Sequence, residues 1–316
     1  MRSIGLGRRE VLAASLALLA CCAPKASRGP VRIGYQRSGV LLLAKARGGL
    51  GKALEGQVSG VQWVEFPAGP PMMEAMAAGA VDFGAVGDAP PIFAQASGAP
   101  IVYAAVQPVT GAGSALLVPA ASKAARVTDL KGRKIAFTKA SSAHLFIIQA
   151  LKTAGLTLAD IQAVHLSPGD AAGAFGAGAI DAWATWDPYY ALAQRDQKAR
   201  VLLTGEGLPR SSSFYIANRH FAETARETLS ALLTALKGEA QWGEAHRAEL
   251  SQLVSQATGL PQDIVAASLR RGPYAVAPVD DAALAGQQAS ADIFREIGAI
   301  PARVDVRAAA WRGWAG

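Results

Sequence analysis

The fold of this chain is decided by the stretch GAVDFGAVGDAP, residues Gly79–Pro90, and by a second stretch, GAIDAWATWDP, at Gly178–Pro188. Each stretch places a β-rich run between a glycine and an aspartate that stands directly before a predicted helix start. Two aspartates have the same spacing in both copies, namely Asp82 with Asp88 and Asp181 with Asp187. A match of this kind, about one hundred residues apart, predicts an internal repeat.

Two further pairs of segments occur in the same order along the chain. VRIGYQRS at 31–38 matches RKIAFTKASS at 133–142, and VQWVEFPAG at 61–69 matches IQAVHLSPG at 161–169. Three matches in register predict two lobes built from the same α/β unit.

Short β-rich runs alternate with helix-forming segments in both units. Strands are predicted at Val31–Tyr35, Val61–Phe66, Val81–Val86, Ile101–Val106, Lys134–Phe137, Ile161–Leu166, Ile180–Thr185 and Val201–Thr204. Helices are predicted at Val40–Arg47, Pro71–Ala78, Pro90–Ala96, Ser142–Ala154, Asp170–Phe175 and Pro188–Gln194. This alternation is typical of mostly parallel sheets covered by helices, so the predicted fold class is α/β, with one such sheet in each of two lobes.

The remaining segments suggest how the lobes are connected. Two apolar stretches, Ser114–Val118 and Phe214–Ala217, fall between the units and are interpreted as the crossings that link them. The tail is predicted to be helical from Asn218 to about Ala257, and again at Pro261–Arg270 and Asp281–Glu296. Short connections favour packing of these helices on the first lobe over an independent helical domain. We therefore expect residues 30–110 with 214–316 to form lobe 1, and 111–213 to form lobe 2.

The N-terminal residues 1–26 are typical of an export signal. A basic segment with Arg2, Arg8 and Arg9 precedes the uncharged run Val11–Ala20, which is about half the length of a membrane span. Leu18-Leu19-Ala20-Cys21 resembles a lipoprotein processing site, so Cys21 is a lipidation candidate. Arg8-Arg9 partly matches a twin-arginine signal, and the export route stays open. We expect a periplasmic protein, either free or anchored through Cys21.

Composition excludes several classes of protein. The chain has 316 residues, of which 51% are hydrophobic and only 17% charged, and this excludes a disordered chain. Both cysteines lie within the first 22 residues, so the mature chain has no thiolate nucleophile, disulfide or zinc–thiolate site. Beyond residue 26 there are 27 basic and 23 acidic side chains, a net charge of +4 that does not indicate nucleic acid.

Cofactors and metals are not indicated by any motif. The four histidines have no ligand spacing, and no glycine-rich phosphate loop follows a predicted strand. We therefore expect neither a metal site nor a cofactor.

Polar residues cluster where predicted strands hand over to helices. In open parallel sheets, ligands bind beyond the C-terminal ends of the strands. Four predicted helix starts, two in each lobe, carry small or acidic residues there, at Ser38-Gly39, Gly87-Asp88, Ser141-Ser142 and Trp186-Asp187. Helix N-termini expose unpaired N–H groups and the positive end of the helix dipole, and such termini bind oxyanions. We expect all four to face one cleft.

These segments resemble the aliphatic sulfonate-binding proteins of bacterial ABC importers, in the nitrate/sulfonate/taurine branch of type II periplasmic binding proteins. The resemblance extends from Val31 to about Trp311. Its most specific stretches are IGYQRSG from Ile33, WVEFPAGP from Trp63, GDAPPIFAQ from Gly87, SSAH from Ser141, DAWATWDPY from Asp181 and SFY from Ser213. The family implies two lobes, a hinge and an alkanesulfonate held in the cleft.

The resemblance implies a non-enzymatic receptor that binds an alkanesulfonate and docks on a membrane permease, and we expect it to be a monomer. The implied contacts are Gln36, Gly87, Asp88, Ser141, Ser142, Trp186, Asp187 and Ser213. N–H groups near Ala89 and Ser142 are expected to bind the sulfonate, while Asp88 and Asp187 cap helices. Tyr35, Tyr189 and Trp186 are expected to line the apolar part of the pocket.

Two alternatives to this reading stay open. A receptor of the same fold for taurine, nitrate or a thiamine-precursor pyrimidine is the first, and a cationic ligand end would require a free carboxylate. A desulfinase-like enzyme of the same fold is the second, although such enzymes use a cysteine that the mature chain lacks.

Overall fold

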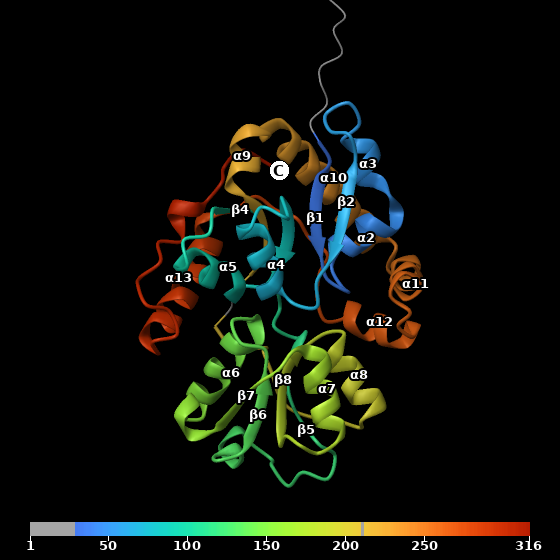
Figure 1. The fold of residues 1–316 in the computed structure, drawn as a ribbon. Helices are drawn as coiled ribbons and strands as arrows, with labels where there is room; N and C mark the ends of the chain where they lie inside the picture. The colour runs from blue at the N-terminus through green and yellow to red at the C-terminus, as the bar shows by residue number, and fades with distance from the viewer. Residues whose placement is uncertain (1–28, 210–211) are drawn as a thin grey trace, which may run out of the picture.

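A computed structural model describes residues 29–209 and 212–316, and it shows two α/β lobes, one above the other in Figure 1. Each lobe contains one five-stranded sheet, with strand order β2-β1-β3-β10-β4 in lobe 1 and β7-β6-β8-β5-β9 in lobe 2. The predicted export signal and Cys21 lie outside the described residues. Within residues 29–209 and 212–316, no helix is long and apolar enough to cross a membrane.

Lobe 1 is built from the first part of the chain and from its tail. Its strands are β1 (Val31–Tyr35), β2 (Val61–Glu65), β3 (Phe83–Val86), β4 (Ile101–Gln107) and β10 (Ser213–Asn218). Its helices are α2 (Val40–Arg47), α3 (Gly49–Ala53), α4 (Gly69–Ala77), α5 (Ala89–Ala96), α9 (Arg219–Thr224), α10 (Arg226–Ala245), α11 (Arg247–Thr258), α12 (Gln262–Leu269) and α13 (Asp281–Glu296), with a 3-10 turn at Arg307–Ala309.

Lobe 2 is inserted between β4 and β10 of lobe 1. Its strands are β5 (Ser114–Val118), β6 (Lys134–Phe137), β7 (Gln162–His165), β8 (Ala182–Trp186) and β9 (Arg200–Thr204). Its helices are α6 (Ser142–Thr153), α7 (Pro168–Gly176) and α8 (Tyr189–Asp196), with 3-10 turns at Val127–Leu130 and Leu158–Asp160. The ends of the predicted strands and helices in the two repeated units differ from these by no more than two residues.

The repeated aspartates make the same contact in both lobes. Asp82 accepts a hydrogen bond of 2.8 Å from the backbone N–H of Arg32, at the start of β1, and Asp181 accepts one of 2.8 Å from the N–H of Lys134, at the start of β6. In each lobe the aspartate thereby fixes the strand that follows it beside its parallel neighbour. The sequence repeat is a repeat in structure.

The two stretches interpreted as crossings are strands inside the sheets. β5 lies antiparallel between β8 and β9, and β10 lies antiparallel between β3 and β4. The interpretation was wrong because each stretch lies next to a point where the chain passes from one lobe to the other. In sequence, a short apolar strand at such a point looks the same as a linker. The sheets are otherwise parallel, as predicted.

The helices of the tail pack on lobe 1. Leu229, Leu232 and Leu236 of α10 are buried in one hydrophobic cluster with Ile33 of β1 and Leu43 of α2. The predicted single helical run after Asn218 is divided into α9, α10 and α11, with breaks at Ala225 and His246. α12 also contacts α8 of lobe 2, so the tail spans from one lobe to the other.

Candidate functional site

A cavity of about 330 Å³ lies between the two lobes. Its wall includes all four helix starts singled out in the sequence, at Ser38-Gly39, Gly87-Asp88, Ser141-Ser142 and Trp186-Asp187. The cavity is near the lower end of the range for small-molecule sites. Strand order explains the arrangement, because the C-terminal ends of β1, β3, β6 and β8 all point toward the other lobe.

The lobe 1 wall is ordered by side chains that bind backbone. Asp88 caps α5, since its Oδ1 accepts a hydrogen bond of 2.7 Å from the N–H of Ala89. The Gln36 side chain, in the loop after β1, donates to the carbonyl of Ala85 on β3 at 3.1 Å. Gln287 of α13 donates to the carbonyl of Asp88 at 2.6 Å. The turn after β3 is therefore held from three directions.

The lobe 2 wall opposite is the N-terminus of α6. Ser141 is its buried N-cap residue: the hydroxyl accepts from the N–H of Ala143 at 3.2 Å and donates to the carbonyl of Thr138 at 2.7 Å. Ser142 is the first helical residue and lines the cavity. Since Ser141 already donates its hydroxyl proton within the loop, Ser142 is the hydroxyl of this pair whose proton the described contacts leave available.

Gly87 of lobe 1 lies directly against Ser142 of lobe 2. A Cβ atom placed on Gly87 would lie 1.8 Å from Oγ of Ser142 and 3.1 Å from its Cβ. Only glycine allows the two helix starts to come this close without displacing the serine.

Trp186 and Asp187 form the wall at the end of β8. Trp186 is partly buried, and Tyr189 stands edge-on behind it, with ring centroids 6.1 Å apart. Oδ1 of Asp187 accepts from the N–H of Ala191, and both carboxylate oxygens bind Nη1 of Arg271, at 2.8 and 3.1 Å. Burial raises the pKa of the Asp187 carboxyl, and Arg271 opposes that shift.

The structure corrects three of the predicted positions, because Tyr35, Tyr189 and Ala89 do not line the cavity. Tyr35 points into the core against Trp63, with its hydroxyl 3.0 Å from Glu65, since alternate residues of β1 face that side. Tyr189 packs behind Trp186. Ala89 is fully buried, and its N–H is occupied by Asp88.

The other predicted residues lie on the cavity wall, namely Gln36, Gly87, Asp88, Ser141, Ser142, Trp186, Asp187 and Ser213. Ser211, which precedes Ser212 and Ser213, lies outside the described residues. Sequence reasoning missed Gln107 and Thr110 at the end of β4, Phe146 on α6, and Arg271 and Tyr274 after α12. No motif marks Arg271, because its place depends on the path of the tail rather than on the repeated unit.

Metal chemistry finds no support in the described parts of the chain. Among residues 29–209 and 212–316, no group of three or more His, Cys, Asp or Glu side chains could hold a metal ion. His144 is buried against Phe137, Phe93 and Phe294 rather than directed at a ligand, and burial lowers its pKa to about 4.

Comparisons with known proteins agree with this architecture. The family model described as ABC transporter, phosphonate, periplasmic substrate-binding protein matches residues 43–260. A curated Escherichia coli protein described as an aliphatic sulfonates-binding protein is 40% identical over 292 residues, which are 92% of this chain and 91% of that protein.

Two solved structures are similar along almost the whole chain. The alkanesulfonate-binding protein SsuA from Xanthomonas axonopodis pv. citri, bound to MOPS, is 38% identical with a TM-score of 0.86, covering 91% of this chain and 99% of that one. The periplasmic aliphatic sulphonate-binding protein SsuA from Escherichia coli is 39% identical with a TM-score of 0.79, covering 90% of this chain and 92% of that one. Its family model, its relatives and the cavity between its two lobes show that this chain belongs to the periplasmic substrate-binding proteins of ABC transporters.

Proposed function

We propose that this protein captures aliphatic sulfonates in the cavity between its lobes and delivers them to an ABC importer, without transforming them. The observation that carries the proposal is the convergence of four helix starts on one small cavity, two from each lobe. A sulfonate is a tetrahedral oxyanion, and helix N-termini bind such groups without a full counter-charge. The Escherichia coli and Xanthomonas relatives are named for sulfonate binding, which supports the same ligand here.

The sulfonate group is placed at the α6 side of the cavity. There, Ser142 offers its hydroxyl and its backbone N–H at the first turn of a helix of 12 residues, and Ser213 lines the wall nearby. The N–H of Ala89 is excluded from this set because Asp88 already accepts it. Hydrogen bonds to a charged group contribute about 1.5–3 kcal/mol each, so a few suffice for micromolar binding after the cost of association.

The organic tail is placed against apolar side chains. Leu41, Val109, Phe146, Trp186 and Leu269 all line the cavity. Because Arg271 pairs with the Asp187 carboxylate, this wall favours an uncharged tail over the ammonium group of taurine.

Titration calorimetry with a panel of anions tests the ligand. Ethanesulfonate and longer alkanesulfonates are expected to bind at micromolar concentration, and taurine, sulfate and nitrate more weakly. Ser142→Ala is expected to weaken sulfonate binding by about tenfold or more, from the loss of one charged hydrogen bond. Ser230→Ala, on α10 and away from the cavity, is the matched control. Tighter binding of nitrate or taurine, or no heat with any sulfonate, would refute the proposal, and turnover of a sulfinate would revive the desulfinase.

The location and partner follow in part from the family. The protein is periplasmic and serves an ABC transporter. We further propose that it is a monomer that docks on the membrane permease, that residues 30–110 with 214–316 and residues 111–213 are its two lobes, and that Cys21 carries a lipid. Mass spectrometry of the mature N-terminus tests the last point, since a first residue beyond Cys21 would exclude lipidation.

A further inference from the structure

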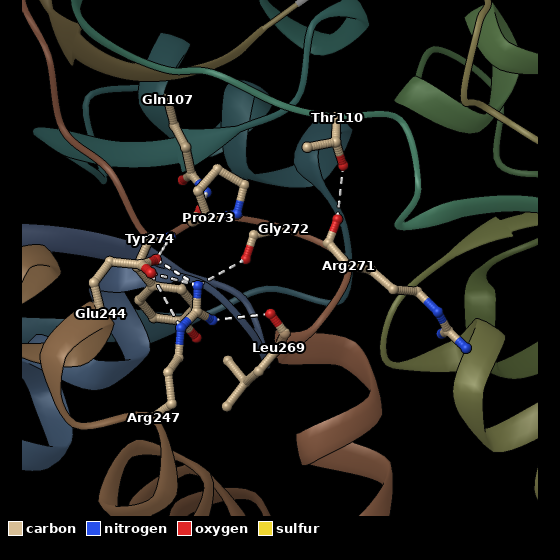
Figure 2. Close-up of polar contacts among 9 residues, drawn as sticks. All are labelled: Gln107, Thr110, Glu244, Arg247, Leu269, Arg271, Gly272, Pro273 and Tyr274. Carbon is tan, nitrogen blue, oxygen red and sulfur yellow. Dashed lines mark hydrogen bonds and ion pairs between the residues drawn. The ribbon is translucent and has the colours of Figure 1, made fainter.

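The segment Leu269–Tyr274, here called the strap, runs from the end of α12 along the cavity (Figure 2). Side chains of lobe 1, and of the segment 108–113 that connects β4 to β5, bind its backbone carbonyls. Nη1 of Arg247 donates to the carbonyl of Leu269 at 2.9 Å, and the Gln107 amide donates to that of Pro273 at 2.8 Å. Thr110 donates to the carbonyl of Arg271 at 2.8 Å. The strap is therefore fixed to lobe 1 and to the start of the segment that connects β4 to β5.

Arg271 extends from the strap in the direction opposite to Arg247 and reaches lobe 2 (Figure 2). Nη1 binds both carboxylate oxygens of Asp187, and Nη2 donates to Oε1 of Gln194 at 2.7 Å. The guanidinium group also lies 3.7 Å from the ring centroid of Tyr190. A single side chain of lobe 1 thus makes three kinds of contact with the end of β8 and with α8.

This pair is sheltered from solvent and forms part of the cavity wall. The side chain of Arg271 is 21% exposed and that of Asp187 is 11% exposed. All of these contacts join lobe 1 to lobe 2, so a movement that separates the lobes would break them together. The arrangement in which they are made is here called closed. In the closed arrangement, Arg271 also neutralises a carboxylate that would otherwise repel an anion in the cavity.

We infer that Arg271 is a positioning residue for the cavity ligand: from the strap it latches lobe 2 in the closed position and neutralises Asp187 in the wall. The ligand used to test this inference rests on the proposed function, but the latch itself does not. The residue acts through Asp187 and α8 rather than by binding the sulfonate.

A second ion pair between the two lobes, formed by α8 and α12, provides a matched control. Arg195 of α8 lies 3.5 Å from Asp263 of α12, but these side chains are 36% and 67% exposed, and Arg195 also binds its neighbour Asp196. Exposed pairs contribute little to stability, because water competes for both charges. The two arginines therefore span the same lobes but differ in burial and in distance from the cavity.

Calorimetry and stopped-flow release of ethanesulfonate compare how much each ion pair contributes to ligand binding. Arg271→Ala is expected to raise Kd by about 10- to 100-fold, mainly through faster release, whereas Arg195→Ala changes it by less than about threefold. Asp187→Asn added to Arg271→Ala is expected to recover part of the lost affinity, because it removes the unpaired charge. Equal effects of the two alanine variants, or no recovery in the double variant, would overturn the inference.

Hydrogen exchange in α8 tests the latch without any ligand. Residues Tyr189–Asp196 are expected to exchange faster in Arg271→Ala than in Arg195→Ala, and equal rates would overturn the latch. Arg271→Lys, which keeps the charge but not the paired geometry, gives an intermediate Kd and replaces the alanine variant if that variant does not fold. A wild-type protein that binds no sulfonate while α8 shows this difference would refute the proposed function and leave the latch intact.

Discussion

The two copies of the repeated unit share their framework and differ where they meet the cavity. Asp82 and Asp181 bind the backbone of the neighbouring strand at the same distance. Six residues later the copies diverge: Asp88 caps its own helix, whereas Asp187 pairs with Arg271 from the tail. The residue before each aspartate is Gly87 in lobe 1 and Trp186 in lobe 2. Gly87 leaves space for the Ser142 side chain, whereas the Trp186 ring forms part of the cavity wall.

This comparison separates two kinds of constraint on the same sequence pattern. Residues that hold one strand beside its neighbour, such as Asp82 and Asp181, have the same role in both lobes, because both sheets need the same strand register. Residues at the strand ends can differ between the copies, because each one faces the opposite lobe rather than the sheet to which it belongs. Asymmetry between the copies is therefore concentrated at the site, and the following changes would break or sharpen that contrast.

Acid is expected to destabilise the protein mainly through lobe 2. Burial lowers the pKa of His144 to about 4, with His165 and Lys139 adding to the shift, and Nδ1 of His144 accepts the N–H of Ala140 at 3.3 Å. Between pH 4 and about 6.5 the unfolded state binds the extra proton, so stability is full above pH 6.5 and is lost as the pH falls toward 4. The contribution is roughly 3 kcal/mol.

Thermal unfolding at several pH values measures this contribution. His144→Phe, which keeps an aromatic ring against Phe137, should flatten the change in melting temperature between pH 6.5 and 4. His220→Gln, exposed on α9 of lobe 1, is the control and should keep the wild-type profile. A steep acid profile that survives in His144→Phe would remove this asymmetry between the lobes.

The shared aspartates are expected to differ in energy. Asp82 also binds the Arg32 guanidinium through two atoms, at 2.5 and 2.9 Å, whereas Asp181 stands 4.0 Å from Arg133 and its side chain is 43% exposed. Asp82→Asn should cost about 1.5 kcal/mol and Asp181→Asn less than about 1 kcal/mol, because each retains the backbone contact but loses its charge. Urea unfolding monitored on each lobe checks the order, and equal losses would contradict it.

A methyl group where Gly87 lies against Ser142 should act on ligand binding. Gly87→Ala places a Cβ 1.8 Å from the present position of Oγ of Ser142, so that hydroxyl must rotate away from it. We expect sulfonate affinity to fall by about tenfold, or about 1.4 kcal/mol, with little change in melting temperature. Gly238→Ala in α10, where a Cβ meets nothing within 4 Å, is the control. Unchanged affinity in Gly87→Ala would show that this contact is not needed for binding.

The smallest expected effect compares the first helices of the two lobes. Ser141 caps α6 with its hydroxyl, whereas the residue before α2, Gly39, has no side chain to cap that helix. Ser141→Ala should lower the free energy of unfolding by about 1 kcal/mol, and Ser38→Ala should lower it by less. Denaturant titration of both variants tests the difference, which would vanish if another acceptor replaced the Ser141 hydroxyl at the start of α6.

Much of the fold was predictable because glycines and β-rich runs mark its units. α2 and β6 have the predicted bounds, and the position of the cavity followed from the C-terminal ends of parallel strands. The face of a strand was not predictable at Tyr35, since alternation tells which residues share a side but not which side meets the ligand. Arg271 was missed for another reason: it belongs to no repeat, and only the tertiary path of the tail brings it to Asp187.

The insertion of lobe 2 into lobe 1 has a mechanical consequence. β1 begins the described chain in lobe 1, and the C-terminal Trp314 is buried in the same hydrophobic cluster. A surface attached at either end of the described chain therefore immobilises lobe 1 and leaves lobe 2 able to move. In an immobilised sensor, one reporter group belongs on each lobe, because the distance between the two groups would then report whether a ligand is bound.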